Sequence, residues 1–322
     1  MGTMEERRAF LREHADTPGP IIQQYGEKFI DFRGLKKWDL PEYVVVGVAP
    51  TGVFIDRDQN PHQPMTTAEL VREFTACVEL GAVSLHMHVR DAAGKVTADP
   101  AVYRQVIDPL RQRYGKDVVI DGGTMTGVTF EEAMSPVTEG LFDLCIVNPT
   151  TGLLGDSVRA MTPPTTRRQA EYYTLCGVKP MIDVHEASSI DNAKRYLIDT
   201  GLVRPPTVWH ILAGLPGTMF MPNPRAMAEG LLFLVNRIRE IDPTAFIFVS
   251  DPARAGIYLS VFALLLGLHV RLGMEDTIWK YPHRDEKIED NAEVVRAVIE
   301  IAERLGRRPA TAAEFRKAVG IG

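Results

Sequence analysis

The segment LHMHVRD, from Leu85 to Asp91, places two histidines on alternate positions of a short apolar run. If this run is a β-strand, His86 and His88 point to the same side of it, because side chains alternate across a strand. Two imidazoles on one side can bind a single metal ion. A third ligand from another strand would complete the set that is usual for catalytic zinc, with one position open for water or substrate. The alternative is that both are ordinary buried histidines.

Short apolar runs recur along the chain, with amphipathic helical patterns between them. Strands are expected at YVVVGVAP, AVSLHMHV, DVVIDGG, LCIVNP, KPMIDVH, TVWHILAG, AFIFVSD and HVRLGME, and helices at 67–80, 100–114, 165–176, 189–200, 224–240 and 254–266. Nearly continuous apolar character is typical of parallel strands that are covered on both faces. Eight such βα units predict an α/β fold of the (β/α)8 TIM-barrel type over residues 41–322, with residues 1–40 as an N-terminal arm.

A doubly wound open sheet is the alternative fold. A dinucleotide cofactor would then require a G-x-G-x-x-G motif directly after the first strand, where the sequence has APTGVF instead. The sequence therefore gives no support for a nicotinamide cofactor.

Composition favours a small molecule as the partner. The net charge of -6 and the pI near 5.8 provide no basic surplus for nucleic acid or anionic lipid. The three cysteines are widely spaced and lie in apolar stretches, which indicates reduced core thiols in a cytoplasmic protein. The N-terminus has no apolar signal-peptide region, and LSVFALLLGLHV is too short to span a bilayer.

Polar groups end the predicted strands, and in a barrel of this kind the active site lies at the carboxyl ends of the strands. Burying so many charges is costly unless they pair with one another or a cation organises them. Glu275 is the candidate third metal ligand, because the last strand of a closed barrel neighbours the first. His210 is either a core histidine or a group that orients others. The residues at the strand ends are Thr51, Gly52, His86, His88, Arg90, Asp91, Asp121, Gly122, Gly123, Thr124, Asn148, Asp183, His185, Glu186, His210, Ser250, Asp251, Arg271, Glu275 and Asp276.

Two of these strand ends carry a family resemblance. HMHVRDAAGKVTADPAVY and LGLHVRLGMEDTIW resemble the β-keto acid cleavage enzymes, and the similarity extends from VVVGVAPTG to NAEVVRAVIEIAERLGRRPAT. The resemblance implies a zinc-bearing (β/α)8 barrel that assembles as a homotetramer. It also implies a reaction between a β-keto acid and acetyl-CoA, which gives acetoacetate and the CoA ester of the remaining fragment. The implied metal ligands are His86, His88 and Glu275, the set already reached from the strand ends; zinc is expected, although another divalent metal is possible.

The resemblance also implies roles for other residues. Asp276 occupies the position of the catalytic base, and Arg271 would hold the substrate carboxylate or the base. Asp183 matches an acidic position and could orient a ligating histidine, or else be a buried acid paired with Arg90 or Arg271. Substrate contacts are expected from Thr51, Phe54, Gly123, Thr124 and Asn148.

The sequence departs from the family after the first strand, where Val53 and Phe54 replace a glutamate that meets an amino group. We therefore expect a β-keto acid with a neutral or apolar tail. The third strand ends in DGGTMTG rather than a serine-threonine-glycine turn, which leaves substrate affinity open. The remaining alternatives are a CoA-independent metal-dependent aldolase or hydrolase and an inactive barrel that binds a metal or small molecule.

Overall fold

The computed structural model describes residues 2–17, 32–123, 129–155, 157–219 and 221–322. The predicted site residue Thr124 lies outside these ranges. The chain divides into two compact units, Met1–Asp39 and Leu40–Gly322. In the first unit, helix α1 (Met4–Glu13) begins at a capping box in which Thr3 and Glu6 satisfy each other's backbone amides, and a 3-10 turn, η1, covers Phe32–Gly34.

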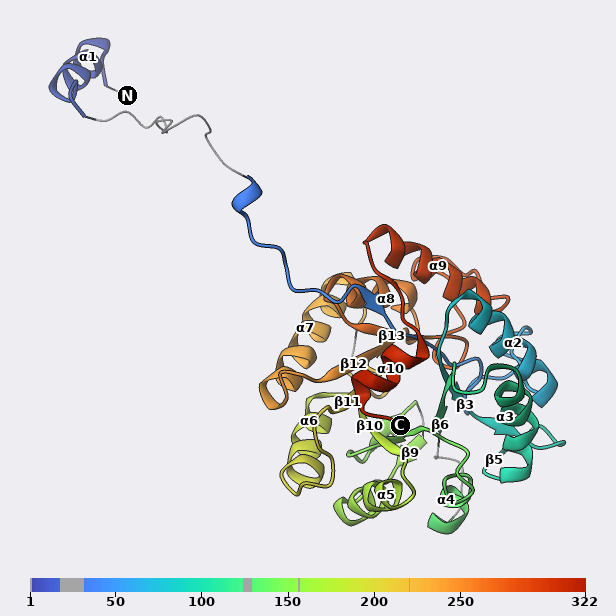
Figure 1. The fold of residues 1–322 in the computed structure, drawn as a ribbon. Helices are drawn as coiled ribbons and strands as arrows, with labels where there is room; N and C mark the ends of the chain where they lie inside the picture. The colour runs from blue at the N-terminus through green and yellow to red at the C-terminus, as the bar shows by residue number, and fades with distance from the viewer. Residues whose placement is uncertain (1, 18–31, 124–128, 156, 220) are drawn as a thin grey trace. The chain divides into compact units, whose positions relative to one another are not determined.

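The second unit is a closed barrel of parallel strands with helices around it (Figure 1). The (β/α)8 prediction is therefore correct, and each predicted run supplies one barrel strand. In barrel order the strands are β2 (Val46–Val48), β3 (Ser84–Met87), β6 (Val119–Gly122), β7 (Leu144–Val147), β10 (Lys179–Val184), β11 (Val208–Ile211), β12 (Phe246–Ser250) and β13 (His269–Leu272). The last strand, β13, pairs with β2 and closes the ring.

One helix follows each barrel strand and packs its apolar face on the outside of the barrel. These helices are α2 (Thr67–Leu80), α3 (Pro100–Tyr114), α4 (Phe130–Thr138), α5 (Pro163–Leu175), α6 (Ala187–Ala193), α7 (Pro224–Ile241), α8 (Gly256–Leu265) and α9 (Asn291–Arg304). A π-helical turn, η2 (Lys194–Ile198), continues α6. Local signals fix the starts, as at α3, where the side chain of Asp99 caps the helix and Pro100 stands at its first turn. Within the described residues, no helix combines the length and apolarity needed to cross a bilayer.

The inside of the barrel has an apolar layer and a polar layer, because every second residue of a strand points inward. Met181, Val208 and Phe248 lie in an apolar cluster that Phe315 of helix α10 (Ala312–Val319) joins at the end where the strands begin. Two residues further along, the inward positions become polar. At these positions lie Asp183, His210, Ser250 and, on β13, Arg271.

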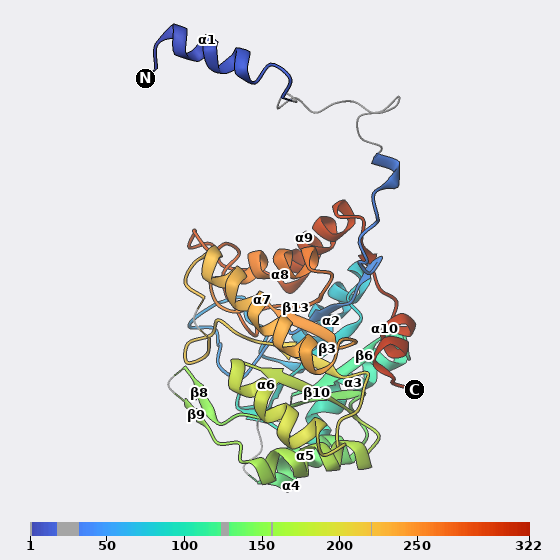
Figure 2. The same cartoon turned by 90° about the vertical axis from the view of Figure 1, so that its left-hand side faces the viewer.

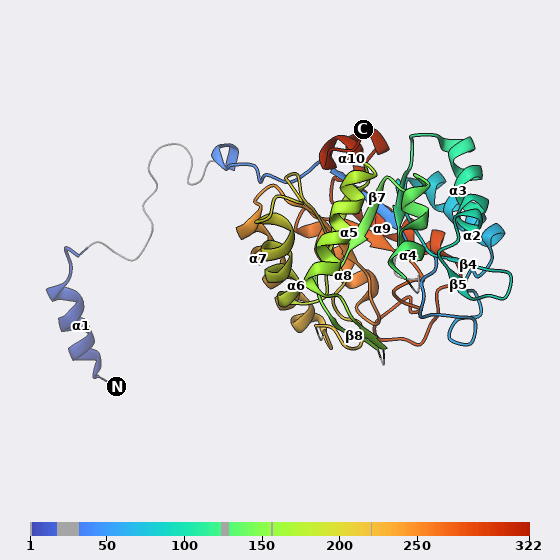
Figure 3. The same cartoon turned by 90° about the horizontal axis from the view of Figure 1, so that it is seen from below.

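In the described part of the chain, three pairs of short strands lie outside the barrel ring. They are β1 (Tyr43–Val44) with β14 (Arg308–Pro309), β4 (Val89–Arg90) with β5 (Val96–Thr97), and β8 (Gly152–Leu154) with β9 (Ser157–Arg159). Figures 2 and 3 show the β8–β9 hairpin and α10 at opposite ends of the barrel. The hairpin therefore stands at the end where the polar layer lies.

His269 in the apolar layer makes the stability of the barrel depend on pH. Its Nδ1 accepts a hydrogen bond of 3.0 Å from the Val45 amide, and its ring stacks on Phe246 with centroids 4.0 Å apart. Burial, aided by nearby Arg307, lowers the pKa of His269 from 6.5 to about 3. Between these values the unfolded chain binds a proton that the folded chain does not, so this stabilising contribution is complete above pH 6.5 and is lost as the pH falls.

We expect the free energy of unfolding of the metal-free protein to fall, through this residue, by up to about 1.4 kcal/mol per pH unit below pH 6.5. Urea unfolding between pH 4.5 and 7.5 measures the slope. His269→Phe should be less stable at pH 7. The slope of its unfolding free energy against pH should be smaller by the amount that corresponds to about one proton. His62→Ala, which removes an exposed imidazole, is the control and should leave the slope unchanged. Equal slopes for the wild type and His269→Phe would contradict the assignment.

Candidate active site

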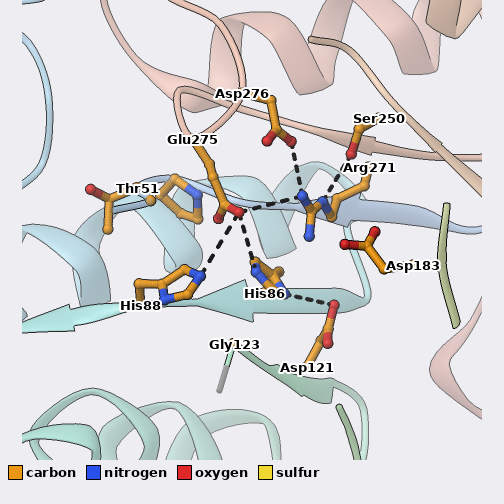
Figure 4. A network of polar contacts seen from close by, with 12 residues as sticks. Thr51, His86, His88, Asp121, Gly123, Asp183, Ser250, Arg271, Glu275 and Asp276 are labelled. Carbon is orange, nitrogen blue, oxygen red and sulfur yellow. Dashed lines mark hydrogen bonds and ion pairs between the residues drawn. The ribbon is translucent and has the colours of Figure 1, made fainter. Parts of the chain in front are cut away.

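Three predicted metal ligands lie together at the carboxyl end of the barrel (Figure 4). His86 comes from β3, His88 follows the same strand, and Glu275 stands in the segment after β13. Glu275 Oε1 lies 3.3 Å from His86 Nε2 and 3.9 Å from His88 Nε2. One ligand atom from each residue falls within 4.8 Å of the other two, which is the convergence that a single ion requires.

The donor atoms fit a divalent cation. Among the residues that the structure describes, His86 Nε2 and Glu275 Oε2 are buried and make no hydrogen bond. Buried polar atoms without partners are costly, and a bound cation would satisfy both of them. On the far side of the His86 ring, Nδ1 lies 2.9 Å from Asp121 Oδ2, an ion-pair contact that fixes the ring's orientation in the way typical of ligating histidines. Two imidazoles and a carboxylate are a common ligand set for catalytic zinc.

The electrostatics of the three residues differ. Burial lowers the pKa of His86, but the Glu275 and Asp121 carboxylates outweigh burial and raise it to about 9. For His88 burial prevails and lowers the pKa to about 4. Burial opposes the charge on Glu275, yet His86 and Arg271 hold its pKa well below the usual value. A cation that binds here must therefore displace a proton from His86, because a histidine ligates in its neutral form.

Arg271 and Asp276 form a buried ion pair beside the three ligands (Figure 4). Arg271 Nη2 donates to Asp276 Oδ2 at 2.9 Å and reaches Glu275 Oε1 at 3.4 Å. Burial disfavours the guanidinium charge, but the two carboxylates raise the pKa of Arg271 above its ordinary value. Within the described part of the chain Arg271 Nη1 has no hydrogen-bond partner. This donor is therefore available to a carboxylate in the cavity.

A cavity adjoins the ligands and the ion pair. Its lining residues are Val53, Phe54, His86, His88, Gly123, Ile146, Arg159, Asp183, Leu212, Leu215, Arg271, Glu275 and Asp276. A larger cavity of about 840 Å³ lies beside Lys179 at the start of β10 and contains none of the predicted site residues. We assign the chemistry to the smaller cavity, because it contains the convergent polar groups.

Two of the predicted substrate contacts have partners within the protein. Thr51 is buried and accepts a hydrogen bond of 3.1 Å from Gln63 Nε2. Asn148 Nδ2 donates to Asp183 Oδ2 at 3.0 Å. These contacts indicate that Thr51 and Asn148 support the site from within the protein. Phe54 and Gly123 do line the cavity, and Phe54 is 48% exposed.

Asp183 is surrounded by histidines other than the candidate ligands. Its Oδ1 lies 2.8 Å from His210 Nδ1, and its Oδ2 lies 2.9 Å from His185 Nε2. The candidate ligand His86 is contacted by Asp121 rather than by Asp183. The arginine near Asp183 is also not one of the two expected: Arg159 Nη1 lies 3.8 Å from Asp183 Oδ2, whereas Arg271 pairs with Asp276 and Arg90 donates to the Gly52 carbonyl.

Sequence reasoning placed Asp121 at a strand end without giving it a role, and it missed Arg159. Asp121 stands directly opposite His86 in the β3–β6 register, so the order of predicted strand ends contained a signal for it. Arg159 comes from the β8–β9 hairpin and lines the cavity, with Nη2 3.0 Å from His185 Nε2. The hairpin lies between a barrel strand and the helix that follows it. Hydrophobic periodicity in the sequence does not predict that a residue of such a hairpin reaches the site.

Glycines make room for the ligands, and this gives a testable result at Gly52. A Cβ atom there would lie 2.5 Å from Glu275 Cγ, so Gly52→Ala must displace the carboxylate. We expect zinc affinity, measured by competition with a chromophoric chelator, to fall by at least about tenfold. Gly152→Ala is the matched control because nothing lies within 4 Å of its Cβ position. Unchanged affinity in Gly52→Ala would contradict the placement of Glu275.

A family model described as beta-keto acid cleavage enzyme matches residues 43–321. The chain belongs to the β-keto acid cleavage enzyme family. This family member is 29% identical over 283 residues to the 3-keto-5-aminohexanoate cleavage enzyme of Acetoanaerobium sticklandii, with 87% of this chain and 99% of that protein covered. It is 25% identical over 282 residues to the 3-oxoadipate:acetyl-CoA acetyltransferase of Cupriavidus necator, with 86% and 94% covered.

A third relative of this family member is the 3-dehydrocarnitine:acetyl-CoA trimethylamine transferase of Rhizobium meliloti, at 26% identity over 294 residues, with 82% of this chain and 92% of that protein covered. The solved apo structure of ObcA aligns with a TM-score of 0.72 at 18% identity, covering 81% of this chain and 66% of ObcA, which shows a shared fold. The family is one of enzymes, and the two transferases are named for acetyl-CoA.

Proposed function

We propose that this enzyme uses zinc to cleave a β-keto acid with acetyl-CoA, which gives acetoacetate and a new acyl-CoA. The observation that carries the proposal is the convergence of His86, His88 and Glu275 beside the Arg271–Asp276 ion pair. A site for a Lewis acid, a cationic carboxylate receptor and a carboxylate base then face one cavity. These are the groups that removal of a proton next to a keto group requires.

The protein groups have distinct roles in this reaction. Arg271 Nη1 binds the substrate carboxylate, and Asp276 accepts a proton from the carbon between the carboxylate and the keto group. Zinc, when bound, would supply Lewis-acid stabilisation of negative charge on the keto oxygen. The ion pair with Arg271 keeps the Asp276 carboxylate oriented, and the apolar lining limits the access of water.

The proposed reaction conserves all atoms. The carbon that loses its proton attacks the acetyl carbonyl of acetyl-CoA and forms a carbon–carbon bond as the CoA thiolate leaves. The thiolate then attacks the original keto carbon. The bond between that carbon and the former nucleophile breaks, which releases the acyl-CoA, and Asp276 returns the proton to complete acetoacetate.

We further propose that the substrate tail is neutral or apolar. Val53, Phe54, Leu212 and Leu215 line the cavity, and among its described lining residues no carboxylate stands at the loop after β2 to meet an ammonium group. Arg159, a cation of the lining besides Arg271, favours a different tail: its Nη1 lies 3.8 Å from Asp183 Oδ2 but makes no hydrogen bond among the described residues. A substrate tail that ends in a carboxylate is therefore the competing class.

Mass spectrometry of the zinc-loaded protein with acetyl-CoA and a panel of β-keto acids tests these proposals. The panel should include neutral, ammonium and carboxylate tails, and acetoacetate and new acyl-CoA esters should be scored together. We expect paired products, with neutral tails turned over fastest and 3-keto-5-aminohexanoate poorly. Products formed without acetyl-CoA would favour an aldolase or hydrolase. A preference for carboxylate tails would contradict the proposal of a neutral or apolar tail and would indicate that Arg159 binds the tail carboxylate.

We also propose that the enzyme assembles as a homotetramer. Leu232 and Phe233 on α7 and Leu265 on α8 are large apolar side chains that remain exposed on one chain, and burial between subunits would remove them from water. Light scattering coupled to size-exclusion chromatography measures the mass of the assembly. A monomeric mass at micromolar concentration would contradict the proposal.

A further inference from the structure

We infer that His210 and Ser250 are positioning residues that hold Arg271, and through it the base Asp276 and the metal ligand Glu275. Neither residue lines the cavity as described, and both are 0% exposed. The inference concerns the architecture of the site, and its effect on turnover rests on the proposed function.

The contacts run across four neighbouring strands. Asp183 of β10 lies 2.8 Å from His210 Nδ1 of β11, and His210 Nε2 lies 2.6 Å from Ser250 Oγ of β12. Arg271 Nε of β13 donates to the same hydroxyl at 3.0 Å. Arg271 Nη2 then reaches Asp276 and Glu275. The strand register explains this order, because Asp183 pairs with His210, and Ser250 pairs with Arg271.

The proton positions in this chain are determined by the chemistry of its two ends. An arginine Nε–H can only donate, so the Ser250 oxygen accepts from Arg271. At the other end the Asp183 carboxylate, whose pKa is held low against burial by His185 and His210, can only accept, so His210 carries a proton on Nδ1 and donates it there. Because the buried ring is neutral, its Nε2 has no proton and accepts the hydroxyl proton of Ser250. His210 is thus a neutral imidazole in one tautomer, in agreement with the lowering of its pKa by burial and by Arg271.

Asp183, His210 and Ser250 have the contact order of a nucleophilic triad, but the surroundings exclude that role. The Ser250 hydroxyl is buried and is engaged by the Arg271 guanidinium, so no acyl group can approach it. Nucleophilic catalysis needs a hydroxyl that faces the substrate. The same contacts instead fix the guanidinium of Arg271 at Nε, which turns Nη2 toward the two carboxylates and leaves Nη1 for the substrate.

Gly47 lies beside the stem of Arg271. It pairs with Arg271 across the β13–β2 register, and a Cβ atom there would lie 3.4 Å from Arg271 Cγ. The Arg271 stem thus passes over a strand position without a side chain, and among the described residues Nε donates to the Ser250 hydroxyl alone. Loss of the Ser250 hydroxyl would leave two buried groups unpaired, Arg271 Nε and His210 Nε2, and the guanidinium would turn to find a new acceptor.

Ser250→Ala in the zinc-loaded enzyme tests the inference. We expect kcat to fall by at least about tenfold with the KM for acetyl-CoA changed less than about twofold, since Arg271 and Asp276 act on the β-keto acid. Zinc affinity, measured in a chelator competition, should also fall by at least about threefold because Glu275 loses a fixed neighbour. Ser250→Thr, which keeps the hydroxyl, should restore kcat and zinc affinity to within about threefold of the wild type.

Ser260→Ala is the matched control. Ser260 on α8 is also 0% exposed, and within the described residues its hydroxyl has no hydrogen-bond partner. Its removal should leave kcat, KM and zinc affinity unchanged. Thermal unfolding of all variants shows whether a loss of activity comes from unfolding or from displacement of the Arg271 guanidinium. A folded Ser250→Ala enzyme with wild-type kcat and zinc affinity would overturn the inference, whereas an inactive wild type would instead reject the proposed function.

Nuclear magnetic resonance of zinc-loaded protein with ¹⁵N-labelled histidine provides a test that does not depend on activity. The two-bond ¹⁵N–¹H pattern distinguishes histidine tautomers, and comparison with His210→Gln identifies the His210 signals. We expect a neutral ring protonated on Nδ1. A ring protonated on Nε2 would show that Ser250 does not donate to His210, and the inference would fail.

Discussion

Replacing Asp276 with asparagine is expected to lower kcat by about 10²- to 10⁴-fold, the range that a general base contributes. Asparagine has nearly the same shape as aspartate, and its amide oxygen can still accept the hydrogen bond that Arg271 Nη2 donates at 2.9 Å. The buried ion pair becomes a hydrogen bond to a charged group, while the proton acceptor is lost. Zinc content should stay at the wild-type level, because Asp276 is not one of the three convergent ligands.

The measurement combines steady-state kinetics with metal analysis of the same sample. Asp108→Asn is the control because Asp108 is 62% exposed on α3 and lies outside the cavity lining. An inactive barrel that only binds metal or a small molecule would respond equally to both substitutions. Wild-type turnover in Asp276→Asn would remove Asp276 from the mechanism, and loss of zinc from that variant would show that Asp276 helps to hold the metal.

His86→Ala is expected to lose bound zinc and, with it, activity. The substitution removes a candidate ligand and leaves the Asp121 carboxylate buried beside a void. Loss of a ligand should cost more than the 10- to 100-fold in affinity, roughly, that loss of an orienting partner costs. We therefore expect a graded series in chelator competition, with His86→Ala the weakest, Asp121→Ala intermediate and the wild type the tightest.

The control for this series is His62→Ala, which removes an exposed imidazole that is not one of the candidate ligands. Its zinc content should match that of the wild type. Differential scanning fluorimetry with and without zinc provides a second readout, because a metal that binds only the folded state raises the unfolding midpoint. A thermal shift on zinc addition that is as large in His86→Ala as in the wild type would place the metal elsewhere.

The sequence predicts the barrel well because the inward and outward faces of its strands are both apolar for much of their length. Val208 and Trp209 are consecutive residues of β11 and both are buried, one inside the barrel and one beneath the helices. Such runs are typical of parallel strands. The candidate ligands could be predicted for a related reason, since His86 and His88 obey the strand period and Glu275 follows β13, the strand that closes the ring.

The rest of the site depends on side-chain direction beyond the strand ends, which periodicity does not determine. Asp183 could be placed in the polar layer, but its hydrogen bonds to His210 and Asn148 follow from registers that form only when the barrel closes. Thr51 lies in the segment after β2, and its hydroxyl contacts Gln63 within the protein. Arg159 lies on a hairpin whose position relative to the barrel no local pattern predicts.

The hairpin formed by β8 and β9 has a consequence for how substrate preference can change during evolution. Its contribution to the cavity is Arg159, whereas the candidate ligands and the ion pair belong to β3 and the end of β13. Strand pairing holds those elements rigidly, but a surface hairpin accepts insertions and substitutions at low cost in stability. Recombination or mutation of this one segment can therefore alter which β-keto acid is accepted, while the groups that perform bond cleavage are inherited unchanged.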